Sequence, residues 1–224
     1  VDDLGQIEEK DFTDAHLDAV LALPTVDVEA VRAAGFKVAL DAVNSVGGII
    51  MPRLLERMGV ECVCVNCEPT GEFAHNPEPL PSNLVELCEA VVANGADFGI
   101  SVDPDVDRLA LICENGQPFG EEYTLVSVAD YLLSRIYNEA LETGKSIEEI
   151  AAPYQMVTSS NLSSSRALRD VTEQYGGEYC TAAVGEVNVT TKMREAGALI
   201  GGEGNGGVIY PALHYGRDAM VGVA

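Results

Sequence analysis

Three aspartates at alternating positions, directly after a predicted buried strand, form the segment with the clearest potential for chemistry. Asp103, Asp105 and Asp107 stand two residues apart. In an extended loop, side chains two residues apart point the same way and lie about 6–7 Å apart, so the carboxylates are expected to converge. Each adjacent pair then repels by roughly 2.5 kcal/mol at an effective dielectric constant near 20. A hard cation would relieve this repulsion, and three carboxylates that leave coordination positions open suit Mg²⁺.

Arg108 follows this loop and would place a bidentate donor for phosphate or carboxylate beside the metal. A solvated acidic turn without a metal remains the open alternative. A calcium EF-hand is disfavoured, although Glu114 stands at the twelfth position counted from Asp103. The sixth position is Arg108, where an EF-hand needs glycine, and both flanks are predicted strands rather than helices.

A second polar segment lies about a hundred residues further on, where glycines surround two polar side chains. Glu203 and Asn205 are the only non-glycine residues in residues 201–207. The glycines, Gly202 among them, let the backbone approach a ligand closely. A carboxylate accepts hydrogen bonds and a carboxamide both donates and accepts, so the pair suits neighbouring sugar hydroxyls. A glycine-rich bulged hairpin without a ligand is the alternative, and the absence of a following Gly-Lys-Ser/Thr excludes a P-loop.

Alternating strands and helices are predicted to position these two loops. The predicted strands are residues 36–41, 60–66, 97–103, 151–160, 178–185 and 198–211, the last interrupted by glycines, and residues 109–119 are predicted to form a hairpin. The predicted helices are residues 49–60, 79–96, 124–141, 163–177 and 188–196, with a further helix beginning near the end of the chain. Ser82 is expected to cap the second helix, and Asn115-Gly116 predicts a type I′ turn. The repeated strand, helix, strand rhythm predicts α/β layers.

Two α/β domains of similar size are expected. The first, residues 1–118, begins with a linker segment and carries the aspartate loop. The second, residues 119–224, carries the glycine-rich loop, and its unfinished last helix leads us to expect truncation at the C-terminal end.

Composition restricts the class of protein. The 224 residues include 36 Asp and Glu against 13 Lys and Arg, a formal net charge of −23 that disfavours nucleic-acid and anionic-membrane partners. Hydrophobic residues make up 47% without a long apolar run, so a cytoplasmic globular protein is expected.

The six cysteines are expected to be reduced thiols. A metal site at Cys62, Cys64 and Cys67 is disfavoured because the first two share one strand face and His75 is the only nearby nitrogen ligand.

The two polar loops, in this order and spacing, resemble those of the α-D-phosphohexomutase superfamily of phosphoglucomutase, phosphomannomutase and phosphoglucosamine mutase. Residues 103–108 resemble the magnesium loop of that family, D-G/P-D-x-D-R, and residues 202–207 resemble its sugar-binding loop in a G-E-G-N-G-G form. Residues 71–84 and 214–218 also match family segments. The resemblance covers nearly the whole chain and implies two consecutive mixed-sheet α/β domains, the second and third of four.

The resemblance implies a reaction and roles for residues. In this family a phosphoserine donates its phosphoryl group to a hexose phosphate, and the resulting bisphosphate turns over and returns its other phosphate. Mg²⁺ on Asp103, Asp105 and Asp107, completed by that phosphoserine, would neutralise the transferred group, and Arg108 would be a catalytic residue that orients the phosphoserine. The implied substrate ligands are Gly202, Glu203 and Asn205, with Glu186 at a turn that faces the sugar, where a carboxylate would favour an amino sugar.

The family parts that the chain lacks limit what it is expected to do. Ala74-His75-Asn76-Pro77 imitates the phosphoserine loop, but Ala74 stands at the serine position, so the match is interpreted as a coincidence. The expected partners are a hexose or hexosamine phosphate and the missing domains, and the chain alone is expected to be inactive. A complete, non-catalytic acidic module that binds a sugar or a cation is the alternative. A haloacid-dehalogenase-like phosphatase is excluded, because Asp41 is followed by Ala42-Val43 rather than by an Asp two residues on. The sequence leaves the identity of the sugar phosphate open.

Overall fold

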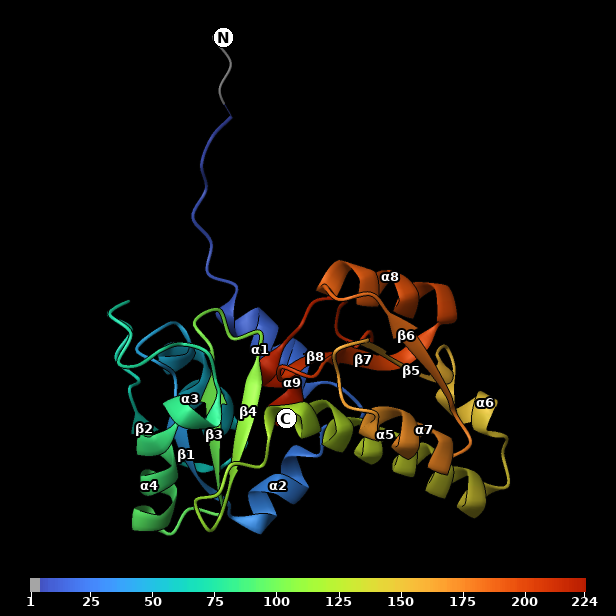
Figure 1. The fold of residues 1–224 in the computed structure, drawn as a ribbon, viewed down its shortest axis with the longest axis horizontal. Helices are drawn as coiled ribbons and strands as arrows, with labels where there is room; N and C mark the ends of the chain where they lie inside the picture. The colour runs from blue at the N-terminus through green and yellow to red at the C-terminus, as the bar shows by residue number, and fades with distance from the viewer. Residues whose placement is uncertain (1–4) are drawn as a thin grey trace.

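The first half of the chain builds a four-stranded sheet in which three strands are parallel and the last is antiparallel (Figure 1). The strand order is β2-β1-β3-β4. The strands are β1 (Lys37–Asp41), β2 (Glu61–Val65), β3 (Phe98–Val102) and β4 (Leu109–Cys113). Parallel strands need crossover connections, and these contain α3 (Gly47–Arg57) and α4 (Val85–Asn94). The computed structural model describes residues 5–224.

Helices cover both faces of this first sheet. Leu54 and Leu55 of α3 pack with Leu40 of β1 in one core, and all three side chains are buried. On the opposite face, Leu87 of α4 packs with Ile112 of β4. The alternation of buried side chains between two cores explains why the strands are apolar on both sides.

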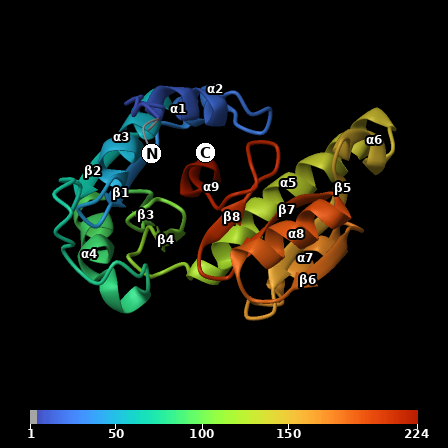
Figure 2. The same ribbon diagram turned by 90° about the horizontal axis from the view of Figure 1, so that it is seen from above.

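The second half repeats the same topology (Figures 1 and 2). Its sheet has the order β6-β5-β7-β8, again with only the last strand antiparallel. The strands are β5 (Gln155–Asn161), β6 (Glu178–Ala182), β7 (Ala198–Glu203) and β8 (Gly207–Ile209). The helices are α5 (Glu121–Thr143), α6 (Ile147–Ala151), α7 (Ala167–Gln174) and α8 (Glu186–Ala196). Buried side chains of α5 and α7 share one core and those of α8 another, so this sheet is also covered on both faces.

Both polar loops occupy the same place in the repeated topology. Residues 103–108 connect β3 to its antiparallel neighbour β4, and residues 204–206 connect β7 to β8. The prediction of two mixed-sheet α/β domains is therefore confirmed, while the division between residues 118 and 119 stays a prediction.

Short elements at the two ends of the chain connect the lobes. They are α1 (Thr13–Leu21), α2 (Val28–Ala34) and α9 (Ala219–Val223). Leu17 of α1 and Met220 of α9 lie in the core of the first lobe, whereas Val221 of α9 packs in the core of the second. Helices α1 and α2 were not predicted from the sequence, because short helices with few buried side chains carry a weak apolar period and depend on tertiary contacts for stability.

Three local predictions were wrong. The glycine-rich segment 198–211 is not one interrupted strand but two antiparallel strands joined by a turn. Helix α4 begins at Val85, and Ser82 lies in a preceding 3₁₀ turn without capping it. The turn at Asn115-Gly116 has a positive φ at Gly116 only, whereas a type I′ turn needs positive φ at both residues.

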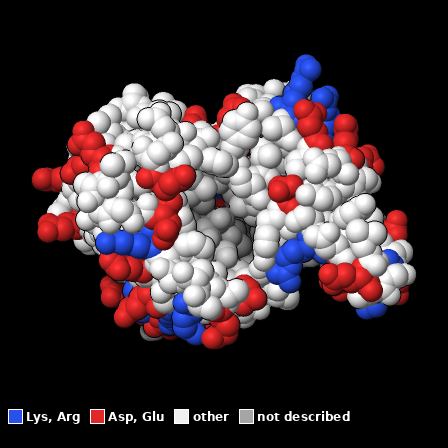
Figure 3. All heavy atoms as spheres, turned by 90° about the horizontal axis from the view of Figure 1, so that it is seen from below, with Lys and Arg blue, Asp and Glu red and all other residues white. Residues whose placement is uncertain are grey.

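Acidic side chains are spread over both lobes on the face shown in Figure 3, with fewer basic ones, and this face is hollowed between the lobes. Within residues 5–224, no helix combines the length and apolarity that crossing a membrane requires.

Candidate functional site

The aspartate loop brings its three carboxylates together, but by a turn rather than by an extended chain. One oxygen of each aspartate lies within 4.8 Å of the others. Asp103 is buried, and its Oδ1 accepts the backbone N–H groups of Asp107 and Arg108, both at 3.0 Å. Val106 has φ +62°, a rare conformation for a β-branched residue. The predicted convergence is observed, and the predicted extended geometry is wrong because the loop wraps around the Asp103 carboxylate.

The charge balance of this loop fits a divalent cation. Burial raises the pKa of Asp107 to about 6. The negative charge of Asp103 adds to this shift, and the positive charge of Arg217 partly offsets it. The Oδ1 atom of Asp107 is buried without a hydrogen bond, and the Nε atom of Arg108 lies 3.7 Å away. A metal ion would satisfy this orphaned oxygen and stabilise the ionised carboxylate. Three hard oxygen donors, one of them exposed at Asp105, are the donor set that Mg²⁺ prefers.

Arg108, at the end of the aspartate loop, also contacts the loop that precedes α4. Its Nε donates to Asp103 Oδ2 at 2.7 Å, and its Nη1 donates to Glu78 Oε2 at 2.6 Å. The side chain is 20% exposed and faces the cleft described below. Glu78, to which no role was assigned from the sequence, orients the guanidinium that is predicted to contact a phosphoryl group.

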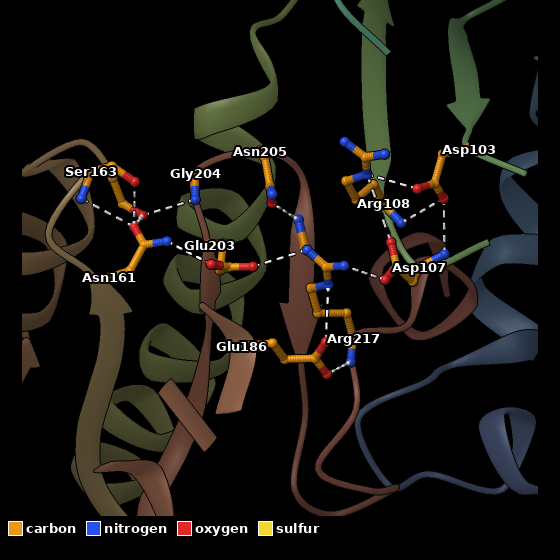
Figure 4. Close-up of polar contacts among 12 residues, drawn as sticks. Asp103, Asp107, Arg108, Asn161, Ser163, Glu186, Glu203, Gly204, Asn205 and Arg217 are labelled. Carbon is orange, nitrogen blue, oxygen red and sulfur yellow. Dashed lines mark hydrogen bonds and ion pairs between the residues drawn. The ribbon is translucent and has the colours of Figure 1, made fainter. Parts of the chain in front are cut away.

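The glycine-framed loop holds its carboxylate in a fixed orientation. Glu203 is 5% exposed, and its Oε1 accepts from Asn161 Nδ2 at 2.7 Å (Figure 4). Asn161 Oδ1 in turn accepts from the hydroxyl groups of Ser163 and Ser164 at 2.9 and 2.7 Å. Because Asn161 ends β5, its position at the carboxyl edge of the sheet is the sequence signal that could have identified it.

A cleft of about 250 Å³ lies where the two loops face each other. Glu203, Gly204 and Asn205 line it from the second lobe, and Arg108 and Glu78 line it from the first. Its full lining is Glu78, Pro79, Leu80, Arg108, Glu121, Glu122, Asn161, Ser163, Val184, Glu203, Gly204 and Asn205. The cleft therefore combines a guanidinium, several carboxylates and amides, which together can bind an anionic group and a polyol.

Two of the predicted substrate residues lie outside this lining. Gly202 has φ +158°, and a Cβ atom there would lie 2.0 Å from the carbonyl oxygen of Gly207, so its role is to let β7 and β8 approach. Glu186, at the start of α8, instead accepts the backbone N–H of Arg217 at 3.1 Å.

Backbone and side-chain contacts join the two loops directly. The backbone N–H of Leu109 donates to the carbonyl oxygen of Gly206 at 3.0 Å, and Arg108 forms an isolated antiparallel bridge with Gly207. Arg217, which follows β8, reaches both Asp107 and Glu203 (Figure 4). Arg217 stands in the segment 214–218 that resembles a family segment, but its place beside the cleft follows from tertiary structure.

A second cluster of possible ligands, His16, His214 and Asp218, lies at the junction of the lobes. Both imidazole Nε2 atoms contact Asp218 Oδ2, at 2.8 and 3.1 Å. The backbone N–H of Gly216 donates to His214 Nδ1 at 2.9 Å, so the hydrogen-bond network assigns the proton of His214 to Nε2. An Nε2–H group is a donor to the carboxylate and not a metal ligand, so this cluster anchors α1 to the cap of α9.

Replacing His16 with glutamine is expected to destabilise the fold by roughly 1–2 kcal/mol near pH 5.5 and by less at pH 9. The hydrogen bond to Asp218 raises the pKa of His16, so its contribution is complete below the unfolded value near 6.5 and is lost as pH rises through the folded value. Burial opposes ionisation of Asp218, but its two histidine partners lower its pKa to about 2. The stability that the ionised Asp218 contributes is therefore lost only as pH falls from about 3.8 toward 2. Urea unfolding at both pH values measures the difference, and equal losses would contradict the proposed ion pair.

The fold and the site together define the class of this protein. Two α/β domains of one topology meet at a cleft, which is lined by Arg108 of the aspartate loop and by Glu203 of the glycine-framed loop. The chain belongs to the phosphoglucomutase/phosphomannomutase family. The family model for α/β/α domain II matches residues 14–116, and the model for domain III matches residues 129–224.

Individual relatives agree with this assignment. The chain is 34% identical over 223 residues to a phosphoglucomutase/phosphomannomutase of Thermococcus kodakarensis and 30% identical over 225 residues to a probable phosphoglucosamine mutase of Methanopyrus kandleri. These alignments cover 99% and 100% of the chain but only 45% of each relative. A solved structure of a family protein from Burkholderia thailandensis is 26% identical, with a TM-score of 0.78 over 96% of this chain and 43% of that one. The chain therefore corresponds to the two middle domains and spans less than half the length of these relatives.

Proposed function

We propose that this chain is the central part of a phosphohexomutase, which interconverts hexose 1-phosphates and 6-phosphates through an enzyme phosphoserine and a bisphosphate intermediate. The observation that carries the proposal is that the aspartate loop and the glycine-framed loop reach one cleft, the first through Arg108, which lies next to the three aspartates, and the second through Glu203 and Asn205. Such an arrangement holds a cation beside the position of a sugar, as phosphoryl transfer to a sugar hydroxyl requires.

Each residue has a distinct part in this proposal. Asp103, Asp105 and Asp107 would hold Mg²⁺, which supplies neutralisation of the charge on the transferred phosphoryl group. Arg108, fixed by its carboxylate partners, would orient the phosphoserine that another domain presents. Glu203, with Asn205 on the same turn, would bind sugar hydroxyls in either orientation of the intermediate.

The family assignment leaves the substrate undecided, since its members act on different sugars. The relatives named above include both a phosphoglucomutase/phosphomannomutase and a probable phosphoglucosamine mutase. We propose a hexose or hexosamine phosphate as substrate and Mg²⁺ as cofactor. The chain by itself is expected to show no turnover, because the phosphoserine segment has no counterpart within it.

The proposal is tested on the complete gene product that contains this chain, by assaying conversion of glucose, mannose and glucosamine 1-phosphates. Turnover of at least one substrate is expected, with a loss of about 100-fold or more in the Glu203→Gln variant. Glu114→Gln is the matched control, since Glu114 is exposed at the end of β4 and lies outside the cleft lining. A gene product without mutase activity that still binds Mg²⁺ and a hexose phosphate would instead support a non-catalytic binding module.

A further inference from the structure

Arg217 is a single cation that faces carboxylates from three parts of the structure. Its Nη2 contacts Asp107 Oδ2 in the aspartate loop, and its Nη1 donates to Glu203 Oε2 at 2.9 Å. Its Nε lies 3.5 Å from Glu186 Oε2 at the start of α8. The side chain is 17% exposed, so these charges are only partly screened by water.

Asp107 and Glu203, which Arg217 contacts, have different predicted functions. Asp107 is a predicted ligand of the metal, and Glu203 is a predicted ligand of the sugar. The same guanidinium therefore acts as counter-ion to both, and it does so across the junction of the lobes, because Arg217 follows β8 while Asp107 precedes β4. A planar guanidinium can donate to two carboxylates at once, whereas an ammonium is a point charge.

Mg²⁺ and Arg217 would share the carboxylate of Asp107, the metal at the free Oδ1 and the guanidinium at Oδ2. A divalent cation on Asp103, Asp105 and Asp107 would neutralise Asp107 and repel the guanidinium. Arg217 would then pair more strongly with Glu203 and Glu186, which remain on the second lobe. The extent to which Arg217 offsets the charge of Glu203, and thus the strength of Glu203 as an acceptor for sugar hydroxyls, would depend on whether the metal is bound.

We propose that Arg217 is a positioning residue that couples metal binding in the aspartate loop to sugar binding by Glu203. This inference rests on the proposed function, since it uses the metal and sugar roles assigned there. Coupling of this kind is reciprocal, so Mg²⁺ changes the affinity for the sugar phosphate by the same factor as the sugar phosphate changes the affinity for Mg²⁺.

The test is isothermal titration of the complete gene product with Mg²⁺, alone and with saturating glucose 6-phosphate, in wild type and in Arg217→Met and Arg217→Lys. In Arg217→Met the affinity for Mg²⁺ alone is expected to rise about tenfold, because the neighbouring cation that repels the metal is gone. The change that glucose 6-phosphate causes in Mg²⁺ affinity is expected to disappear. Arg217→Lys retains the charge, so its Mg²⁺ affinity is expected to stay within about threefold of wild type while the coupling is lost.

Controls separate coupling from general effects of charge and stability. Arg169→Met removes one positive charge from the exposed surface of α7 and is expected to change neither affinity nor coupling. If Arg217 had a purely structural role, Arg217→Met would loosen the site and lower its affinity for Mg²⁺. That lower affinity would overturn the inference. Coupling that persists in Arg217→Lys would overturn it as well. Wild-type protein that binds no Mg²⁺ would refute the proposed function together with this inference, whereas unaltered coupling in the Arg217 variants would refute the inference alone.

Discussion

Replacing Asp105 with asparagine is expected to lower the affinity for Mg²⁺ by about tenfold or more while the fold stays intact. Asp105 is exposed, and its carboxylate makes no hydrogen bond or ion pair with residues 5–224, so the substitution removes a ligand charge without removing a structural contact. Asp103 would be a poorer choice, because its carboxylate organises the turn through two backbone N–H groups. Affinity for Mg²⁺ depends on the number of charged ligands, which the variant reduces from three to two.

Titration calorimetry with Mg²⁺ measures the loss, and unfolding in the absence of metal provides the second readout. Without Mg²⁺ the variant is expected to be as stable as wild type or slightly more stable, because repulsion within the aspartate loop is relieved. Glu114→Gln removes an equal charge outside the loop and is expected to leave the affinity unchanged. Equal Mg²⁺ affinity in both variants would place the metal site elsewhere in the protein.

Replacing Gly206 with alanine is expected to destabilise the protein by about 3 kcal/mol or more, which corresponds to a fall of roughly 6–12 °C in Tm. Gly206 has φ +91°, and a Cβ atom there would lie 2.4 Å from the carbonyl oxygen of Leu109. This is the point where the backbone of the glycine-framed loop meets β4, and the carbonyl oxygen of Gly206 accepts the backbone N–H of Leu109. The alanine therefore has to separate the two loops that form the cleft.

Gly120→Ala is a matched control for the backbone strain. Gly120 has nearly the same φ, +98°, but its nearest contact for a Cβ atom is the Tyr123 ring at 3.4 Å. That variant is expected to lose only about 1–2 kcal/mol, the strain of the positive φ without the steric overlap. Thermal unfolding followed by circular dichroism compares the two. Equal losses would mean that the close approach of Gly206 and Leu109 does not stabilise the junction of the lobes.

The sequence by itself determined the alternation of strands and helices and the position of both polar loops at strand ends. Buried strands such as β1 and β3 are short apolar runs between glycines and polar residues, and α5 carries a long apolar period, so local pattern and tertiary structure agree there. The aspartates of the aspartate loop and the glycines of the glycine-framed loop were also recognisable, because the chemistry expected of them depends on residue type and close spacing.

Tertiary structure alone decided how these loops meet. Val106 adopts a positive φ because the turn closes on the Asp103 carboxylate, a conformation that spacing does not predict. Arg217 reaches Asp107 across 110 positions of the chain, and Asn161 reaches Glu203 across 42. Such pairs depend on the packing of two separate sheets, and nothing in the local sequence of either partner encodes the distance between them. The candidate metal ligands could therefore be predicted from the sequence, whereas the charged side chains around them became visible only in the folded chain.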